Sequence, residues 1–181
     1  EDFVKAIEKL NAKNIIILPN NKNIIMAAKQ AAEIVEENVA VVPSKTVPQG
    51  MSALLAFNPT VDLETNKSEM TEALGRVKTG QITFAVRDTN YNGLNIKKDD
   101  YMGIYDGQIV VKDESYLHAA KKLVKAMMDQ DSEILTIFKG EDASDEDVEA
   151  LVEYVGSEFP DVEIEVHDGK QPLYAFIFAV E

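Results

Sequence analysis

The sequence of 181 residues contains no cysteine. Disulfide bonds, thiolate catalysis and cysteine-based metal sites are therefore excluded, and a reducing compartment fits this composition. Long apolar runs are also missing, because no stretch approaches the roughly 20 residues that a membrane-spanning helix needs. The first residues, "EDFVKAIEKL", are acidic and amphipathic, unlike the basic start of a secretory signal. We therefore predict a cytoplasmic protein that does not insert directly into a membrane.

Basic residues are scarce. The 18 lysines and arginines are outnumbered by 32 aspartates and glutamates, which gives a formal net charge of −14. This charge would repel a nucleic-acid backbone or an anionic membrane surface unless a basic patch existed. The pairs Lys97-Lys98 and Lys121-Lys122 are followed or surrounded by acids, which is typical of a solvated surface. Nucleic acid is therefore not an expected partner.

The sequence also lacks the common motifs for phosphate binding and hydrolysis. Its 9 glycines form no Gly-x-Gly-x-x-Gly or Walker-type loop, and no Gly-x-Ser-x-Gly motif occurs. The two histidines, His118 and His167, are far apart and lack a neighbouring metal-ligand pattern. The acidic stretch 140–149 does not have the spacing of a calcium-binding loop and is typical of the start of a helix. We predict no catalytic residue and no metal site.

Residues 1–80 have the periodicity of an α/β lobe. Helices are expected at 2–10, 24–35, 47–57 and 63–80, and strands at 14–18 and 39–44. The continuous β-branched run at 14–18 favours a buried parallel strand. We expect Asn20 or Asn21 to cap the second helix and Gly80 to end the fourth. The order strand, helix, strand, helix predicts half of a doubly wound sheet.

Residues 81–181 have the pattern of an α+β lobe. Strands are expected at 81–88, 133–140, 161–169 and 173–181, helices at 115–129 and 144–158, and a hairpin at 101–112. Asp106-Gly107 within this hairpin is a strong signal for a two-residue turn. Ser144 followed by Asp147 resembles a capping box. The predicted fold class is α/β with an α+β second lobe: a small doubly wound parallel sheet followed by a mixed-sheet lobe.

Polar and aromatic residues follow or precede several predicted elements in greater number than turns require. They are Asn20, Asn21, Asn23, Gln49, Arg87, Asp88, Tyr91, Gln171 and Tyr174. Because loops after parallel strands gather at one edge of a doubly wound sheet, these residues predict an edge that binds a partner. The alternatives are helix capping or turn formation for the asparagines, a salt bridge for Arg87, and a small phosphorylated ligand at the turn 20–23.

Five blocks of the sequence are similar to one bacterial family. They are "ILPNNKNIIMAAKQAAE", "VPQGMSALLAFNP", "VKTGQITFAVRDT", "DYMGIYDGQIV" and "GKQPLYAFIFAVE", and they span nearly the whole chain. They resemble the C-terminal domain of the fatty acid kinase protein FakA, of the dihydroxyacetone-kinase-like YloV family. A start at Glu1 without an initiator methionine fits a domain excised from a longer chain.

The resemblance implies a protein of three parts. An N-terminal kinase domain would hold ATP and magnesium, a middle domain would dimerise, and this C-terminal domain would hold no cofactor. The whole enzyme would phosphorylate a fatty acid carried by a separate B subunit, which is itself a DegV-like protein, and so supply acyl phosphate for phospholipid synthesis.

The resemblance extends in outline to the two-lobed fold of the B subunits and other DegV-like fatty acid binders. Those binders carry a His-Thr-Gly-Pro-Gly-type segment before their last strand, where this sequence reads Gln171-Pro172-Leu173-Tyr174. A carboxylate that leaves water needs charged or hydroxyl donors, and this segment is depleted in them. The resemblance thus implies a non-catalytic domain that contacts the remainder of its own chain and docks the fatty-acid-loaded B subunit. The alternative is a DegV-like module that itself holds an acyl chain.

Overall fold

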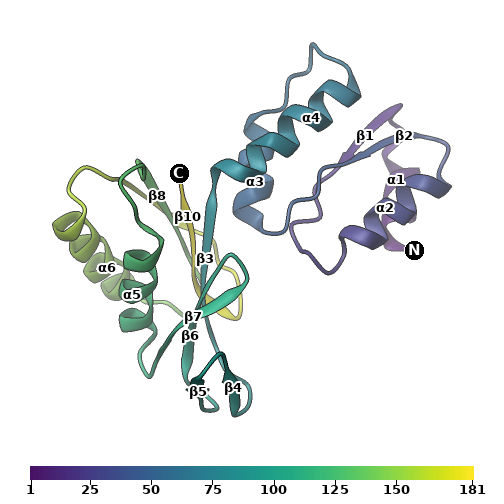
Figure 1. Cartoon of the computed structure of the whole chain (residues 1–181). Helices are drawn as coiled ribbons and strands as arrows, with labels where there is room; N and C mark the ends of the chain where they lie inside the picture. Colours follow the sequence, from purple (N-terminus) through teal and green to yellow (C-terminus); the bar gives the residue numbers. More distant parts are fainter. The chain divides into compact units, whose positions relative to one another are not determined.

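The chain divides between Val77 and Lys78 into two units in the computed structural model, which describes residues 1–181 (Figure 1). Unit 1 is Glu1–Val77 and unit 2 is Lys78–Glu181. The expected lobe boundary at residue 80 falls inside the first strand of unit 2, β3 (Lys78–Phe84). No helix in either unit has the length and apolar character required to cross a membrane.

Unit 1 contains a two-stranded parallel sheet with helices on both faces. Its elements are α1 (Asp2–Leu10), β1 (Asn14–Ile17), α2 (Ile25–Ile34), β2 (Asn38–Val41), α3 (Val47–Leu55), α4 (Leu63–Ala73) and the short 3₁₀ helix η1 (Leu74–Arg76). Helices α1 and α2 pack on the face that carries Ile15, with Ile7 and Ala31. Helices α3 and α4 pack on the other face, where Val42 lies near Ala53. Because the side chains of β1 alternate between two buried faces, its apolar run is unbroken.

Two expected helix ends in unit 1 are wrong. Neither Asn20 nor Asn21 caps α2, whose N-terminus has no side-chain cap. Asn20 has a left-handed backbone with φ of 55°, and its side chain is bonded to another loop instead of the helix. Gly80 does not end α4, because it lies within β3. The side chains that do cap helices in this unit include Thr46 for α3 and Asp62 for α4.

Unit 2 is a six-stranded mixed sheet covered on one face by two helices. Its sheet contains β3, β6 (Tyr101–Tyr105), β7 (Gln108–Asp113), β8 (Ile134–Lys139), β9 (Glu163–Asp168) and β10 (Tyr174–Val180), and its helices are α5 (Tyr116–Met127) and α6 (Asp145–Glu158). The strand order is β7-β6-β3-β10-β8-β9. Strand β9 is parallel to β8, and all other neighbours are antiparallel. The expected mixed sheet is thereby confirmed.

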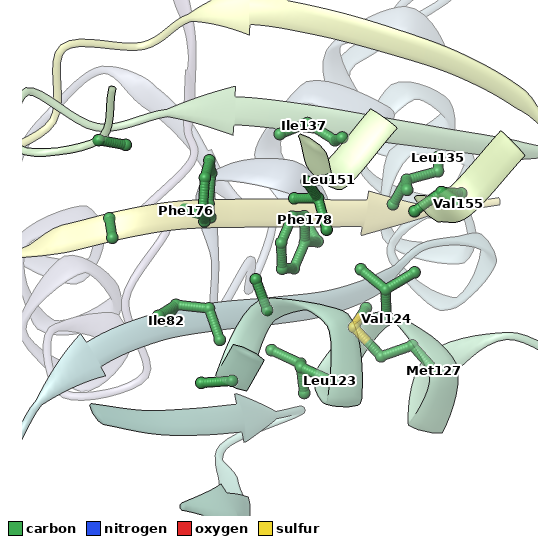
Figure 2. Close-up of a cluster of buried hydrophobic side chains, with 14 of the residues drawn as sticks. Ile82, Leu123, Val124, Met127, Leu135, Ile137, Leu151, Val155, Phe176 and Phe178 are labelled. Atoms are coloured by element: carbon green, nitrogen blue, oxygen red, sulfur yellow. The ribbon is translucent and has the colours of Figure 1, made fainter. Parts of the chain in front are cut away.

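The core of unit 2 lies between the sheet and the two helices. Phe176 and Phe178 on β10 are fully buried, and their stacked rings have centroids 5.7 Å apart. Figure 2 shows them with Leu123 of α5 and Leu151 of α6, which belong to the same cluster. Because β10 lies between β3 and β8, its aromatic side chains fill the centre of this core.

Two tight hairpins occur in unit 2. The predicted turn at Asp106-Gly107 is confirmed, since both residues have positive φ, 45° and 84°, as a two-residue turn requires. The second hairpin, β4 (Thr89–Tyr91) and β5 (Leu94–Ile96), is absent from the sequence-based prediction. Its turn, Asn92-Gly93, also has two positive φ angles. Hydrogen bonds between Ala85 and residues 99 and 100 close its base, and we call residues 86–98 the β4–β5 arm.

Helix α6 begins at a hydrogen-bonded cluster that joins it to α5. Ser144 Oγ accepts a hydrogen bond from the Asp147 N–H at 3.1 Å, as predicted for the N-cap. A full capping box would also have the Asp147 side chain accept a hydrogen bond from the Ser144 N–H. That part of the prediction is wrong, because the Ser144 N–H donates to the Tyr116 hydroxyl oxygen at 3.4 Å. The Asp147 carboxylate instead accepts hydrogen bonds from the Ser144 hydroxyl at 2.8 Å and from the Tyr116 hydroxyl.

This cluster predicts an acid-dependent loss of stability. The pKa of the Asp147 carboxyl is lowered below its usual 3.8, first by the hydrogen bond from Tyr116 and then by that from Ser144. The ionised carboxylate therefore adds stability that is present above pH 3.8 and is lost as the pH falls through the lowered pKa. When the pH is lowered from about 6 to about 2.5, we expect the unfolding free energy of Tyr116→Phe to fall by less than that of the wild type. Urea titrations at both pH values measure this, and equal losses would contradict it.

Candidate functional site

Asn20 holds the loop after β1 against the first turn of α3. The Asn20 N–H donates to Ser44 Oγ at 3.0 Å, and the Ser44 hydroxyl donates to Asn20 Oδ1 at 2.8 Å. Ser44, which follows β2, is fully buried. The Asn20 carboxamide also lies against Gly50, where an added Cβ would be 2.0 Å from Asn20 Oδ1. Asn20 therefore joins the two loops at the carboxyl ends of the parallel strands.

The other predicted residues of unit 1 lie in the same two loops or at the start of α3. Asn21 Oδ1 accepts a hydrogen bond from the Asn23 N–H at 2.9 Å, and both residues remain exposed. This is the local turn that was the alternative for these asparagines. Gln49 Oε1 accepts from the Lys45 N–H at 2.8 Å, so this side chain supports the start of α3.

The contact between Asn20 and Gly50 can be tested by substitution. We expect Gly50→Ala to lower the free energy of unfolding by about 1–3 kcal/mol, because the added methyl group displaces the Asn20 carboxamide from Ser44. Asn20→Gly removes that carboxamide and tolerates the positive φ. The double variant should therefore lose less than the sum of the two single losses in urea unfolding. Strictly additive losses would show that the contact does not couple the two loops.

Helix α3 buries its small side chains and exposes its large apolar ones. The buried residues are Pro48, Gly50, Ser52 and Ala53. The exposed residues share one arc of the helix, and they are Val47 (48% exposed), Met51 (45%), Leu54 (61%) and Leu55 (86%). We call these four residues the apolar face of α3. Contiguous exposed apolar side chains on a soluble protein mark an interaction surface.

The apolar face is not evident from the sequence, because residues 47–57 are apolar on most sides of the helix. Such a pattern is typical of a helix that is buried all round. Side-chain size is the signal that distinguishes the sides. Glycine, serine and alanine allow the helix backbone to approach α4 and the loop after β1 closely, so the side that carries them is the packed one. The larger side chains of the opposite side then remain uncovered within unit 1.

Three of the predicted residues in unit 2 belong to the β4–β5 arm. Asp88 Oδ1 accepts a hydrogen bond from the Lys98 N–H at 2.7 Å, and the Tyr91 hydroxyl donates to Gln108 Oε1. Arg87 is exposed and takes part in no ion pair, so the salt bridge that was its alternative is not found. The arm thus presents a free guanidinium group to solvent.

Gln171 and Tyr174 lie in or beside the connection from β9 to β10. Gln171 Nε2 donates to the carbonyl oxygen of Phe138 at 2.9 Å and to that of Tyr174 at 3.3 Å, which ties the connection to β8. Tyr174 pairs with Thr83 near the end of β3, so it lies at the end of the sheet from which the arm departs. The predicted residues therefore form two groups, one in each unit.

The chemistry that these groups offer is hydrogen bonding, one unpaired cation and apolar contact. No three His, Asp or Glu side chains are grouped closely enough to hold a metal ion. A hollow of about 380 Å³ in unit 1 is lined by Lys29, Ala32, Glu33, Val39, Val41, Pro43, Lys67 and Thr71.

The whole chain matches a family of known proteins. Residues 1–181 match the model of the C-terminal domain of FakA-like fatty acid kinase proteins. Protein YloV of Bacillus subtilis (strain 168) is 52% identical over 181 residues, and an uncharacterized protein of Staphylococcus epidermidis (strain ATCC 35984) is 50% identical over 181 residues. Each comparison covers 100% of this chain and 33% of the relative. The chain thus spans about a third of the length of these relatives.

Solved structures share the fold at low sequence identity. A fatty-acid-binding DegV family protein of Thermus thermophilus has a TM-score of 0.65 at 16% identity, covering 99% of this chain and 76% of that protein. The fatty acid kinase B3 protein of Streptococcus pneumoniae, loaded with linoleic acid, has a TM-score of 0.61 at 15% identity, covering 99% of this chain and 75% of that protein. The dihydroxyacetone kinase of C. freundii, in complex with AMP-PNP and Mg²⁺, has a TM-score of 0.65 at 10% identity, covering 98% of this chain and 40% of that protein.

These similarities confirm both parts of the resemblance seen in the sequence. The solved structures establish the DegV-like fold, and the sequence blocks quoted above fall within the matched region. With its full length matched, the chain belongs to the FakA-like C-terminal domain family of fatty acid kinases.

Proposed function

We propose that this chain is a non-catalytic docking domain of a fatty acid kinase. It would bind the fatty-acid-loaded B subunit while a kinase domain elsewhere in the longer protein phosphorylates the acyl carboxylate with ATP. The observation that carries the proposal is the apolar face of α3. Family membership supports the connection to a kinase, and the B3 protein with linoleic acid supports a fatty acid carrier as the partner.

The apolar face has the composition of the centre of a protein interface. Interface centres are depleted in charge and exclude water, while their rims are polar. Leu54 and Leu55 are the most exposed side chains of the face, and covering them would stabilise a complex by roughly 25 cal/mol for each Å² removed from water. Asn21 and Asn23 follow Asn20, which contacts the first turn of α3, and they would supply polar contacts beside the apolar centre.

The chemical step is assigned to the rest of the longer protein. ATP and magnesium would be held by the kinase domain, and this domain would hold no cofactor. Docking brings the carboxylate of the bound fatty acid to a high effective concentration near the kinase domain, because the two domains belong to one chain. We propose that the reaction takes place in the cytoplasm and supplies acyl phosphate for phospholipid synthesis.

Calorimetric titration of the 181-residue chain with a purified, fatty-acid-loaded B subunit tests the proposal. We expect a one-to-one complex and no turnover of ATP by the mixture. The absence of binding heat at micromolar concentrations of folded protein would rule out docking by this domain alone. Mass spectrometry of the denatured chain provides a separate check, because a released acyl chain would favour the alternative of a module that itself holds lipid.

A further inference from the structure

Strand β1 has a neighbouring strand on one side only. The carbonyl oxygens of Lys13 and Ile17 accept hydrogen bonds from the β2 segment, so the odd-numbered residues of β1 face β2. In a parallel ladder the residues between them direct their N–H and C=O groups the other way. The backbone groups of Asn14 and Ile16 therefore point to a free edge of the sheet.

An uncharged groove lies along this free edge. It has a volume of about 170 Å³ and is lined by Asn14, Ile16, Phe57, Pro59, Val61, Leu63 and Asn66. The Phe57 side chain is 45% exposed there. The hollow at the opposite edge of the sheet, beyond β2, is lined in part by Lys29, Glu33 and Lys67, and charged side chains oppose the addition of a strand. The edge of β1 is thus better suited to receive another strand.

Helix α1 fixes the side on which a preceding strand would lie. It leads into β1 through a short connection and packs on the same face as α2, with Ile7 near Ile15 and Ala31. Connections from one parallel strand to the next through a helix are right-handed in nearly all proteins. Successive right-handed connections over one face advance across the sheet in one direction. Because α2 leads from β1 to β2, a strand that leads into α1 lies on the other side of β1.

We infer that the segment preceding Glu1 in the longer protein supplies a strand parallel to β1. This strand pairs with the backbone of Asn14 and Ile16, contacts Phe57, and forms one β-α-β unit with α1 and β1. The sheet of unit 1 then has at least three strands. The longer relatives contain the additional chain from which such a strand could come. A sheet of two four-residue strands is small, because most sheets have about four to six strands.

Hydrogen exchange followed by mass spectrometry tests the pairing in the 181-residue chain and in the full-length protein. A peptide that covers Asn14–Ile17 should gain two slowly exchanging amides in the full-length protein, those of Asn14 and Ile16, each slowed at least about 100-fold. The amides of Ile15 and Ile17 face β2, so they should be slow in both proteins and provide the internal control. An unchanged number of slow amides would overturn the inference.

A second measurement separates strand pairing from simple coverage by another domain. A chain that starts about 20 residues before Glu1 should unfold at a higher urea concentration than the 181-residue chain. Asn14→Pro removes an N–H that the added strand would bind but keeps the backbone hydrogen bonds to β2; like Asn14→Ala, it loses the side-chain hydrogen bond from Asn38. Asn14→Pro should abolish most of the increase in the unfolding urea concentration that the added residues give, whereas Asn14→Ala should retain that increase. Equal gains in the two variants would overturn the proposed pairing.

Discussion

Leu54→Asp is expected to raise the dissociation constant of the proposed complex with the fatty-acid-loaded B subunit by about 100-fold, which corresponds to about 2.7 kcal/mol. Leu54 belongs to the apolar face of α3 and is 61% exposed, so its replacement removes little packing within unit 1. In a covered interface, the aspartate carboxylate would lose its hydration without gaining an opposite charge. Calorimetric titration of the variant and the wild type measures the difference.

Leu10→Asp is the matched control. Leu10 lies on α1, outside the apolar face, and is also 61% exposed. This variant should match the wild type in its affinity for the B subunit, and both variants should keep the unfolding free energy of the wild type to within about 0.5 kcal/mol. If Leu54→Asp binds as tightly as Leu10→Asp, the apolar face of α3 is not the docking surface.

Phe178→Ala should have the largest effect on stability, a loss of about 3–5 kcal/mol of unfolding free energy. Phe178 is fully buried on β10 and stacks on Phe176, so its removal leaves a cavity at the centre of the unit 2 core. Domains of this size have an unfolding free energy of only about 5–15 kcal/mol, so the variant would keep little net stability. Urea unfolding followed by circular dichroism measures the loss.

Phe84→Ala is the control for this prediction. Phe84 lies at the end of β3, is 36% exposed, and should lose no more than about 1 kcal/mol. Both substitutions remove the same atoms from the same sheet. The difference between their losses of unfolding free energy therefore measures the contribution of side-chain burial. Similar losses in the two variants would mean that the core of unit 2 does not lie where Phe178 is placed.

Much of the fold could be predicted from signals carried by neighbouring residues. Asp106-Gly107 specifies a turn with two positive φ angles, and Ser144 specifies a helix start, because in both cases the stabilising groups are close in sequence. Asn92-Gly93 carries the same signal as Asp106-Gly107. Its hairpin escapes prediction because β4 and β5 have only three residues each, too few to show alternation.

Features that depend on distant residues could not be predicted. Asn20 does not cap α2, because Ser44 and Gly50 provide its contacts and lie in other segments of the chain. The uncovered side of α3 is likewise decided by what packs beneath its small residues. Among the predicted site residues, Gln171 bonds the backbone of β8 and Gln49 supports a helix start, whereas Arg87 is unpaired. Sequence alone places all three beside predicted loops, and it does not reveal which of them has a structural partner.

The position of β10 has a consequence for biosynthesis. This strand lies between β3 and β8, although it follows every other strand of unit 2 in the sequence. As the polypeptide leaves the ribosome, β6 and β7 can pair at once, but the remaining sheet has no central strand until residues 174–180 have emerged. Until then the edges of β3 and β8 are open to pairing with other nascent chains. Translation that stalls before Tyr174 therefore leaves unit 2 as two unjoined halves that a chaperone would have to protect.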